Sequence, residues 1–150
     1  MYIQTQFSIF MVNKPGVLAQ VLGEFARAKI NILAMTMMDS TEHGVMRLVA
    51  PDSEKVKSVL ADLNLPHNET DVLCVTLSNK PGALAEVVEK LAKNHINISY
   101  AYVTAGARGG KTTGVLKVAD VKKAMRVLKE NPDSHDISGA LRRPPASFRT

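Results

Sequence analysis

Two short segments of the sequence contain residues whose types and spacing suit the binding of a small zwitterion. Asparagine, lysine, proline and glycine follow one another at Asn13–Gly16 and again at Asn79–Gly82. Apolar residues at helical spacing come next, so each glycine stands at the start of a predicted helix. The first N–H groups of a helix have no carbonyl partner within it and lie at the positive end of its dipole. Each segment therefore offers a site for a carboxylate.

A second asparagine follows each predicted helix. Asn31 and Asn97 both stand in an Ile-Asn-Ile sequence that begins the next predicted strand. We expect both to lie near the turn that precedes the helix. A primary amide has one acceptor and two donors, which suits an ammonium and a carboxylate together. The candidate ligand-binding residues are Asn13, Gly16, Val17, Leu18 and Asn31 in the first half and Asn79, Gly82, Ala83, Leu84 and Asn97 in the second.

A simpler interpretation of the two turns stays open. Pro15 has no N–H and fits the first turn of a helix, where that donor would be unpaired anyway. Glycine and asparagine are common in turns for reasons of backbone geometry alone. The segment could thus be a turn and helix cap without a ligand, and its occurrence at matched positions in both halves is what favours binding.

The matched segments belong to a repeat that covers most of the chain. The two Asn-Lys-Pro-Gly segments and the two Ile-Asn-Ile segments are both 66 residues apart. Repeats of this length are whole structural units. We predict two copies of one small domain, at residues 1–68 and 69–141, followed by a mobile basic tail at 142–150.

Each copy shows the element order β-α-β-β-α-β. We predict an α+β fold of two ferredoxin-like βαββαβ units in tandem, with antiparallel sheets and the helices packed on one face. The fourth strand of the first unit, within about 66–72, runs almost directly into the first strand of the second, so one long shared strand is plausible. The expected elements of the second unit are strands at 72–77, 96–104 and 114–119, helices at 82–94 and 120–130, and a short extended piece near 136–141.

Composition restricts the cellular setting and the partners. The chain has 150 residues, 45% of them apolar, and one cysteine, Cys74. It has no stretch of about 20 apolar residues and no signal-peptide pattern at its start, which together predict a cytoplasmic protein. The net charge is +5, but three of these charges lie at Arg142, Arg143 and Arg149. The remaining +2 does not favour a nucleic-acid partner or a membrane surface.

The repeated pattern resembles the ACT domain family. Asn-x-Pro-Gly-x-Leu-Ala, an amphipathic helix and then Asn-Ile at the start of a strand occur in both halves. The resemblance implies regulatory binding of an amino acid where two units meet, by the first-turn amides and the asparagines named above. A partner enzyme or regulator that the ligand-bound protein modulates is part of this hypothesis. Exposed sheet edges and the small size of the units predict a homodimer. The sequence shows no paired carboxylates and no nucleophile–base pair, so we expect neither catalysis nor a cofactor. Serine-binding members often have a histidine where this chain has Met11 and Leu77, so serine is not the expected ligand.

Other functions have less support in the residues. An RNA-binding protein of the same plan is the alternative, but its central strands would need aromatic residues and Phe7 alone is suitably placed. A hydrolase of the acylphosphatase type would need an arginine in the first turn, where this chain has Lys14. The segment 105–112 resembles a phosphate-binding loop, but a strand is expected to follow it. The histidines His43, His67, His95 and His135 are too scattered to predict a metal site.

Overall fold

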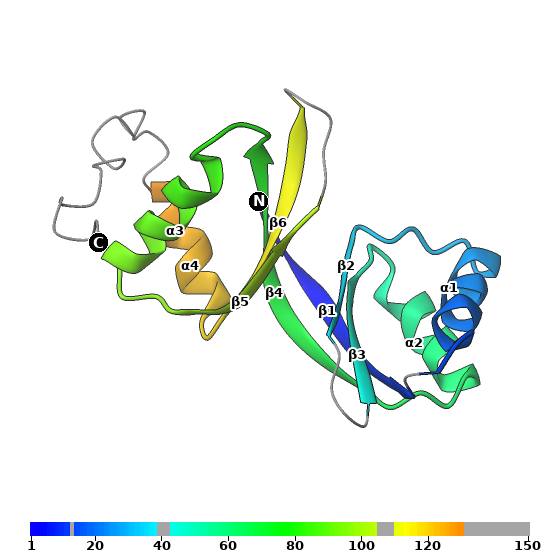
Figure 1. Ribbon diagram of the computed structural model, residues 1–150. Coiled ribbons are helices and arrows are strands. Elements are labelled where there is room, and N and C mark those ends of the chain that lie inside the picture. Colours follow the sequence, from blue (N-terminus) through cyan, green and yellow to red (C-terminus); the bar gives the residue numbers. More distant parts are fainter. Residues whose placement is uncertain (13, 39–42, 105–109, 131–150) are drawn as a thin grey trace, which may run out of the picture.

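The computed structural model describes residues 1–12, 14–38, 43–104 and 110–130, which form one six-stranded antiparallel sheet and four helices (Figure 1). The strand order is β2-β3-β1-β4-β6-β5, which confirms the predicted tandem of βαββαβ units. The elements are β1 (Tyr2–Val12), α1 (Val17–Arg27), β2 (Ala34–Met38), β3 (His43–Val49), α2 (Ser53–Asp62), β4 (His67–Ser78), α3 (Ala83–Lys93), β5 (Ile98–Val103), β6 (Lys111–Val118) and α4 (Val121–Glu130).

The two units share a single long strand, β4. It has 12 residues and runs through the predicted boundary between residues 68 and 69. Its start pairs with β1, from His67 opposite Ile9, and its end pairs with β6, up to Ser78 opposite Lys111. The predicted shared strand is therefore confirmed, and the backbone passes from one unit to the other without a linker.

Strand β1 also serves both units. Its end, Gln6–Val12, pairs with β3 in the first unit. Its start lies beside the second-unit part of β4, where Tyr2 is opposite Cys74 and Gln4 is opposite Val72. In a βαββαβ unit the fourth strand lies beside the first, so the start of the chain occupies that place in the second unit. The extended piece expected near 136–141 lies outside the described residues.

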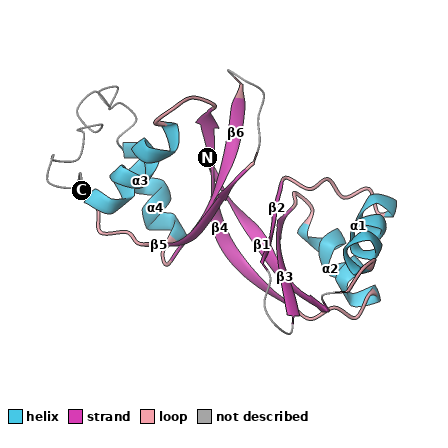
Figure 2. Ribbon diagram, viewed as in Figure 1, coloured by secondary structure: helices cyan, strands magenta, loops and turns pink. Residues whose placement is uncertain are grey.

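Two hydrophobic cores lie between the sheet and the helices. Alternate residues of each strand point to the helices, as the period of two requires. Phe7 and Phe25 are almost completely buried in the core under α1 and α2, and Leu73 and Leu91 in the core with α3 and α4. Figure 2 shows the two helix pairs at opposite ends of the molecule, with the long strands running between them.

A cluster of polar side chains on the opposite face of the sheet joins the units. Gln6 is fully buried. Its Nε2 donates to the Tyr100 hydroxyl at 2.7 Å, and the Tyr102 hydroxyl donates to its Oε1 at 2.9 Å. The guanidinium of Arg47 lies 3.9 Å from the centre of the Tyr100 ring. Since β1 and β5 are not neighbours in the sheet, the sheet must curl to bring these side chains into contact.

The partly buried phenol of Tyr102 makes the stability of the folded state depend on pH in the alkaline range. Burial raises the pKa of Tyr102 above its ordinary value of 10.0, with a smaller contribution from Tyr100. The folded state thus favours the neutral phenol, and this stabilisation is complete below pH ~10 and is lost as the pH rises further. In urea unfolding between about pH 9 and 11, we expect stability to decline more in the wild type than in Tyr102→Phe. Identical profiles would contradict this prediction.

Candidate functional site

The turns before α1 and α3 have the same backbone geometry. The N–H of Val17 donates to the Lys14 carbonyl at 3.3 Å, and the N–H of Ala83 donates to the Lys80 carbonyl at 3.4 Å. The glycine between has φ +87° in the first unit and φ +90° in the second. Proline followed by a glycine of positive φ is the signature of a type II turn. The sequence thus forms this turn locally, and proline stands just before the helix rather than within its first turn.

Both helices begin with glycine at the N-cap position. Gly16 and Gly82 occupy the N-cap positions, and neither helix has a side-chain hydrogen bond there. The first intrahelical bonds run from Gln20 to Gly16 and from Glu86 to Gly82. One of the three expected donors in each turn, that of Val17 or Ala83, is engaged by the turn itself through a long hydrogen bond. The N-cap glycines therefore contribute no side chain to either helix start.

A pocket of about 410 Å³ opens at the start of α3. It is built from the end of β4, the turn, the first turn of α3 and the neighbouring ends of β5 and β6. Three predicted site residues, Asn79, Ala83 and Leu84, line it. The described residues that line it are Leu77, Ser78, Asn79, Lys80, Ala83, Leu84, Val103, Thr104 and Thr112.

The far wall of the pocket is held by backbone hydrogen bonds. The N–H of Thr104 donates to the carbonyl of Thr113 at 3.0 Å, and the N–H of Thr113 donates to Thr104 Oγ1, also at 3.0 Å. The N–H of Asn79 donates to the Gly110 carbonyl at 2.9 Å, which ties the turn to the start of β6. Ser78 and Thr112 lie on the paired strands β4 and β6, and the hydroxyl of Thr104, just after β5, already accepts one hydrogen bond.

The chemistry of the pocket suits a zwitterion with an apolar side chain. Lys80 and the positive end of α3 favour a carboxylate. The hydroxyls of Ser78, Thr104 and Thr112 are possible acceptors for an ammonium group. Among the large apolar residues of the lining, Leu84 is 37% exposed and Val103 is 45% exposed, so they offer contact area at the pocket rim.

Asn97 does not lie at this pocket, and the expectation that it would lie near the turn is wrong. Val103, at the end of β5, and Thr112, near the start of β6, line the pocket. Asn97 precedes Ile98, which pairs with Val118 at the opposite end of β6. The reason is topological: a helix that follows a strand returns the chain to the end where that strand began.

The same displacement separates Asn31 from the first-unit turn. β2 begins at Ala34, which pairs with Val49, and Val49 in turn pairs with Gln6 near the middle of β1. The turn follows Val12, at the far end of β1. The expected proximity of Asn31 to the turn is therefore also wrong. A ligand at one turn could meet such an asparagine only from another unit or another chain.

The equivalent site of the first unit is described in part. Asn13 lies outside the described residues, as do residues 39–42 of the β2–β3 connection. Gly16 is exposed, whereas Val17 and Leu18 pack partly against the first core. The structure thus describes a pocket at the turn of the second unit, and the binding roles of the residues in both units remain predictions.

Sequence reasoning missed the residues that β5 and β6 contribute. Thr104 and Thr112 line the pocket, and the sequence indicated only a hairpin loop at 105–112, with neither threonine among the predicted binding residues. The expected strand after this loop is confirmed, because β6 begins at Lys111. Lys80 belongs to the repeated Asn-Lys-Pro-Gly segment but was not among the predicted ligand-binding residues. Its recurrence as Lys14 is the signal that could have identified it.

Comparison with known proteins identifies the repeated architecture. A family described as an ACT domain pair matches residues 1–138. Protein BT0572 from Bacteroides thetaiotaomicron is 32% identical over 87% of this chain and 89% of that chain, with a TM-score of 0.79. The comparison with curated proteins finds no match.

More distant structures share the fold alone. The regulatory subunit of aspartate kinase from Thermus thermophilus is 13% identical over 89% of this chain and 99% of that chain, with a TM-score of 0.60. The regulatory subunit from Thermus flavus is 15% identical over 88% and 96% of the two chains, with a TM-score of 0.55. Among the described residues, no helix is both long enough and apolar enough to cross a membrane.

Proposed function

The chain belongs to the ACT domain family, whose members are regulatory domains, and from this premise we propose that it senses a free amino acid and modulates a partner enzyme or regulator. The observation that carries the proposal is the pocket at the start of α3, which combines a helix start with a glycine N-cap, Lys80, three hydroxyls and an apolar rim. The ligand changes activity by binding one arrangement of the units better than another.

The proposal includes a homodimer that closes the rim of the pocket. Leu84 and Val88 lie one turn apart on α3 and are 37% and 38% exposed, and Val103 on β5 is 45% exposed. Apolar side chains at a pocket rim favour contact with a second unit. Such a contact could bring an asparagine equivalent to Asn31 or Asn97 to the ligand. Analytical ultracentrifugation with and without ligand tests this part of the proposal.

The alternative of an RNA-binding protein loses its main support. Phe7, the aromatic residue judged suitable for base stacking, is completely buried in the core under α1 and α2. On the helix-free face, the Tyr100 and Tyr102 hydroxyls are engaged by Gln6. Base stacking needs an exposed aromatic face on the sheet, and neither arrangement provides one.

Calorimetric titration with each of the twenty amino acids tests amino-acid binding directly. We expect one or a few to bind with a free energy of about 5–7 kcal/mol, which is micromolar to sub-millimolar affinity. Lys80→Met keeps the aliphatic stem and removes the charge, so it should weaken binding at the second-unit pocket about tenfold. Asn97→Ala should weaken binding only if a second unit completes the site.

Lys14→Met is the matched control, because Lys14 holds the equivalent position in the first-unit turn. If the two variants weaken binding equally, both turns bind ligand. If no amino acid gives heat with the wild type, and Lys80→Met behaves like the wild type in every titration, the proposed function is wrong.

A further inference from the structure

The second helices of the two units, α2 and α4, can be compared residue by residue. Asp52 accepts a hydrogen bond from the N–H of Lys55 at 3.1 Å, and Asp120 accepts one from the N–H of Lys123 at 3.0 Å. Each is a side-chain cap at the start of its helix. The two helices therefore correspond at an offset of 68 residues. The first unit can then serve as an internal reference for the second.

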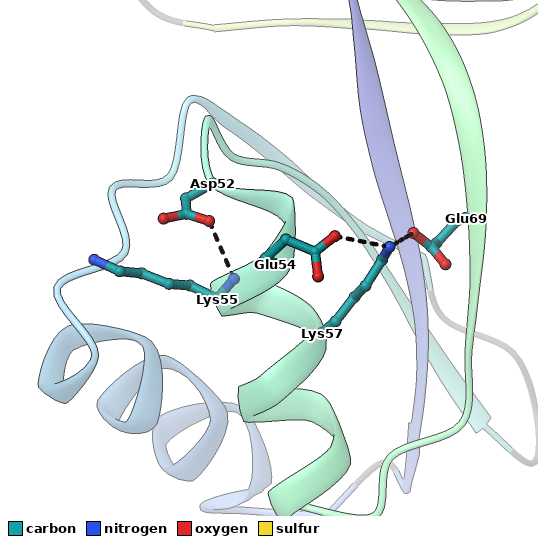
Figure 3. A network of polar contacts seen from close by, with 5 residues as sticks. All are labelled: Asp52, Glu54, Lys55, Lys57 and Glu69. Carbon is teal, nitrogen blue, oxygen red and sulfur yellow. Dashed lines mark hydrogen bonds and ion pairs between the residues drawn. The ribbon is translucent and has the colours of Figure 1, made fainter.

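In the first unit an ion-pair network joins α2 to β4 (Figure 3). Lys57 Nζ lies 3.2 Å from a Glu54 carboxylate oxygen and 3.3 Å from one of Glu69. Glu69 stands on β4 opposite Phe7 of β1. The network links α2 to β4, and the single cation of Lys57 is shared between two carboxylates.

The second unit has apolar residues in place of the Lys57–Glu69 ion pair. Met125 corresponds to Lys57 at the helix offset of 68, and Ile3 takes the place of Glu69. Ile3 is opposite Leu73 as Glu69 is opposite Phe7, and Leu73 repeats Phe7 at the offset of 66. An open groove of about 350 Å³ lies there, lined by Ile3, Lys122, Met125, Arg126, Lys129 and Glu130.

The rim of this groove is strongly basic. Lys122, Arg126 and Lys129 are spaced to share one face of α4, and all three are exposed. None of the ion pairs among the described residues involves them. The equivalent residues of α2 are Glu54, Ser58 and Ala61. Since α2 forms the same helix on the same kind of sheet without these cations, the fold does not require them.

We propose that the groove between α4 and the start of β1 docks an acidic, leucine-rich segment of a partner protein. An apolar side chain of that segment enters between Ile3 and Met125, and flanking carboxylates pair with the cations of Lys122, Arg126 and Lys129. Charge complementarity of this kind selects partners and accelerates their association. A nucleic acid fits less well, because the lining has no aromatic side chain for stacking a base.

A short fluorescein-labelled peptide that alternates glutamate and leucine tests this docking by anisotropy at low ionic strength. We expect the wild type to bind it in a salt-sensitive manner. The double variant Arg126→Glu/Lys129→Glu should bind it at least about tenfold more weakly. The control Lys55→Glu/Lys93→Glu makes the same charge change at exposed positions of α2 and α3, and it should bind like the wild type.

A second variant keeps the basic residues of the groove and changes its apolar residues, Ile3 and Met125. Ile3→Glu/Met125→Lys places the ion pair of the first unit in the second, so it should preserve the helical circular dichroism while weakening peptide binding at least about tenfold. Lys80→Met, which tests the amino-acid pocket, should leave peptide binding unchanged. Peptide binding and amino-acid binding are therefore measured separately, and failure of one proposal does not imply failure of the other.

Several results would overturn the proposal. These are no binding by the wild type, equal weakening in the rim variant and its control, or equal affinity for a peptide of glutamate and serine. Tighter binding of single-stranded RNA through Arg126 and Lys129 would assign the rim to a nucleic acid. Binding that appears only after removal of residues 131–150 would show that the chain's own end occupies the groove.

Discussion

Replacing Gln6 by leucine is expected to lower the free energy of unfolding by about 3 kcal/mol. The leucine fills a similar volume but offers no polar atom to the Tyr100 and Tyr102 hydroxyls, which now bond to the Gln6 amide at 2.7 and 2.9 Å. Each buried hydroxyl left without a partner costs about 1–3 kcal/mol. Urea unfolding followed by circular dichroism measures the loss.

The triple variant Gln6→Leu/Tyr100→Phe/Tyr102→Phe separates lost hydrogen bonds from altered packing. Replacing all partners by apolar groups of similar shape is close to neutral, so the triple variant should recover most of the stability. Gln20→Ala on the exposed surface of α1 is the control and should change stability by less than about 0.5 kcal/mol. A loss in Gln6→Leu no larger than that of the control would show that the cluster does not stabilise the fold.

Dividing the chain between residues 68 and 69 is expected to abolish cooperative folding of both fragments. The cut falls inside β4. It also removes Tyr2–Gln4 from their place beside Val72–Cys74 in the second unit. Met1 and Ile3 pack against the second core, so that fragment loses apolar contacts as well as strand pairing. Units of roughly 70 residues are near the limit of independent stability. We therefore expect neither fragment to stay folded after losing these strand pairs and apolar contacts.

Thermal unfolding of the fragments 1–68 and 69–150, each alone and then mixed, measures this dependence. We expect no cooperative transition from either alone. A matched cut after Ala119, in the connection between β6 and α4, leaves β4 intact and should permit the two pieces to reassociate more readily. Two separate fragments that each melt near the temperature of the intact chain would instead support independent domains at 1–68 and 69–141.

The elements were predictable because their signals lie within a few residues of one another. Val21 and Phe25 are one turn apart and point to the same core. Proline and glycine set the type II turn at Lys80–Ala83 with no help from the rest of the chain. For the same reason the sequence identified Asn79, Ala83 and Leu84, which follow one another along a single turn and helix start and line one pocket.

The parts that were not predictable depend on residues far apart in the chain. Thr104 and Thr112 enter the pocket because β5 and β6 end beside the turn before α3. Gln6 meets Tyr100 and Tyr102 across 94 and 96 residues because the sheet curls. No local pattern records such a contact, since sheet curvature arises from the twist of many paired strands.

By itself, the sequence determined the duplicated βαββαβ plan and the turns that precede α1 and α3. Periodicity and turn chemistry act through neighbours in the chain, so they can be read without a structure. Tertiary structure decided that the start of β1 completes the second unit and that Asn31 and Asn97 lie away from the turns. It also decided that Ile3 meets the basic face of α4. These arrangements depend on which strand pairs with each edge of the sheet and on the direction in which each helix returns the chain. Pairing between residues far apart in the sequence is established only when the whole sheet forms.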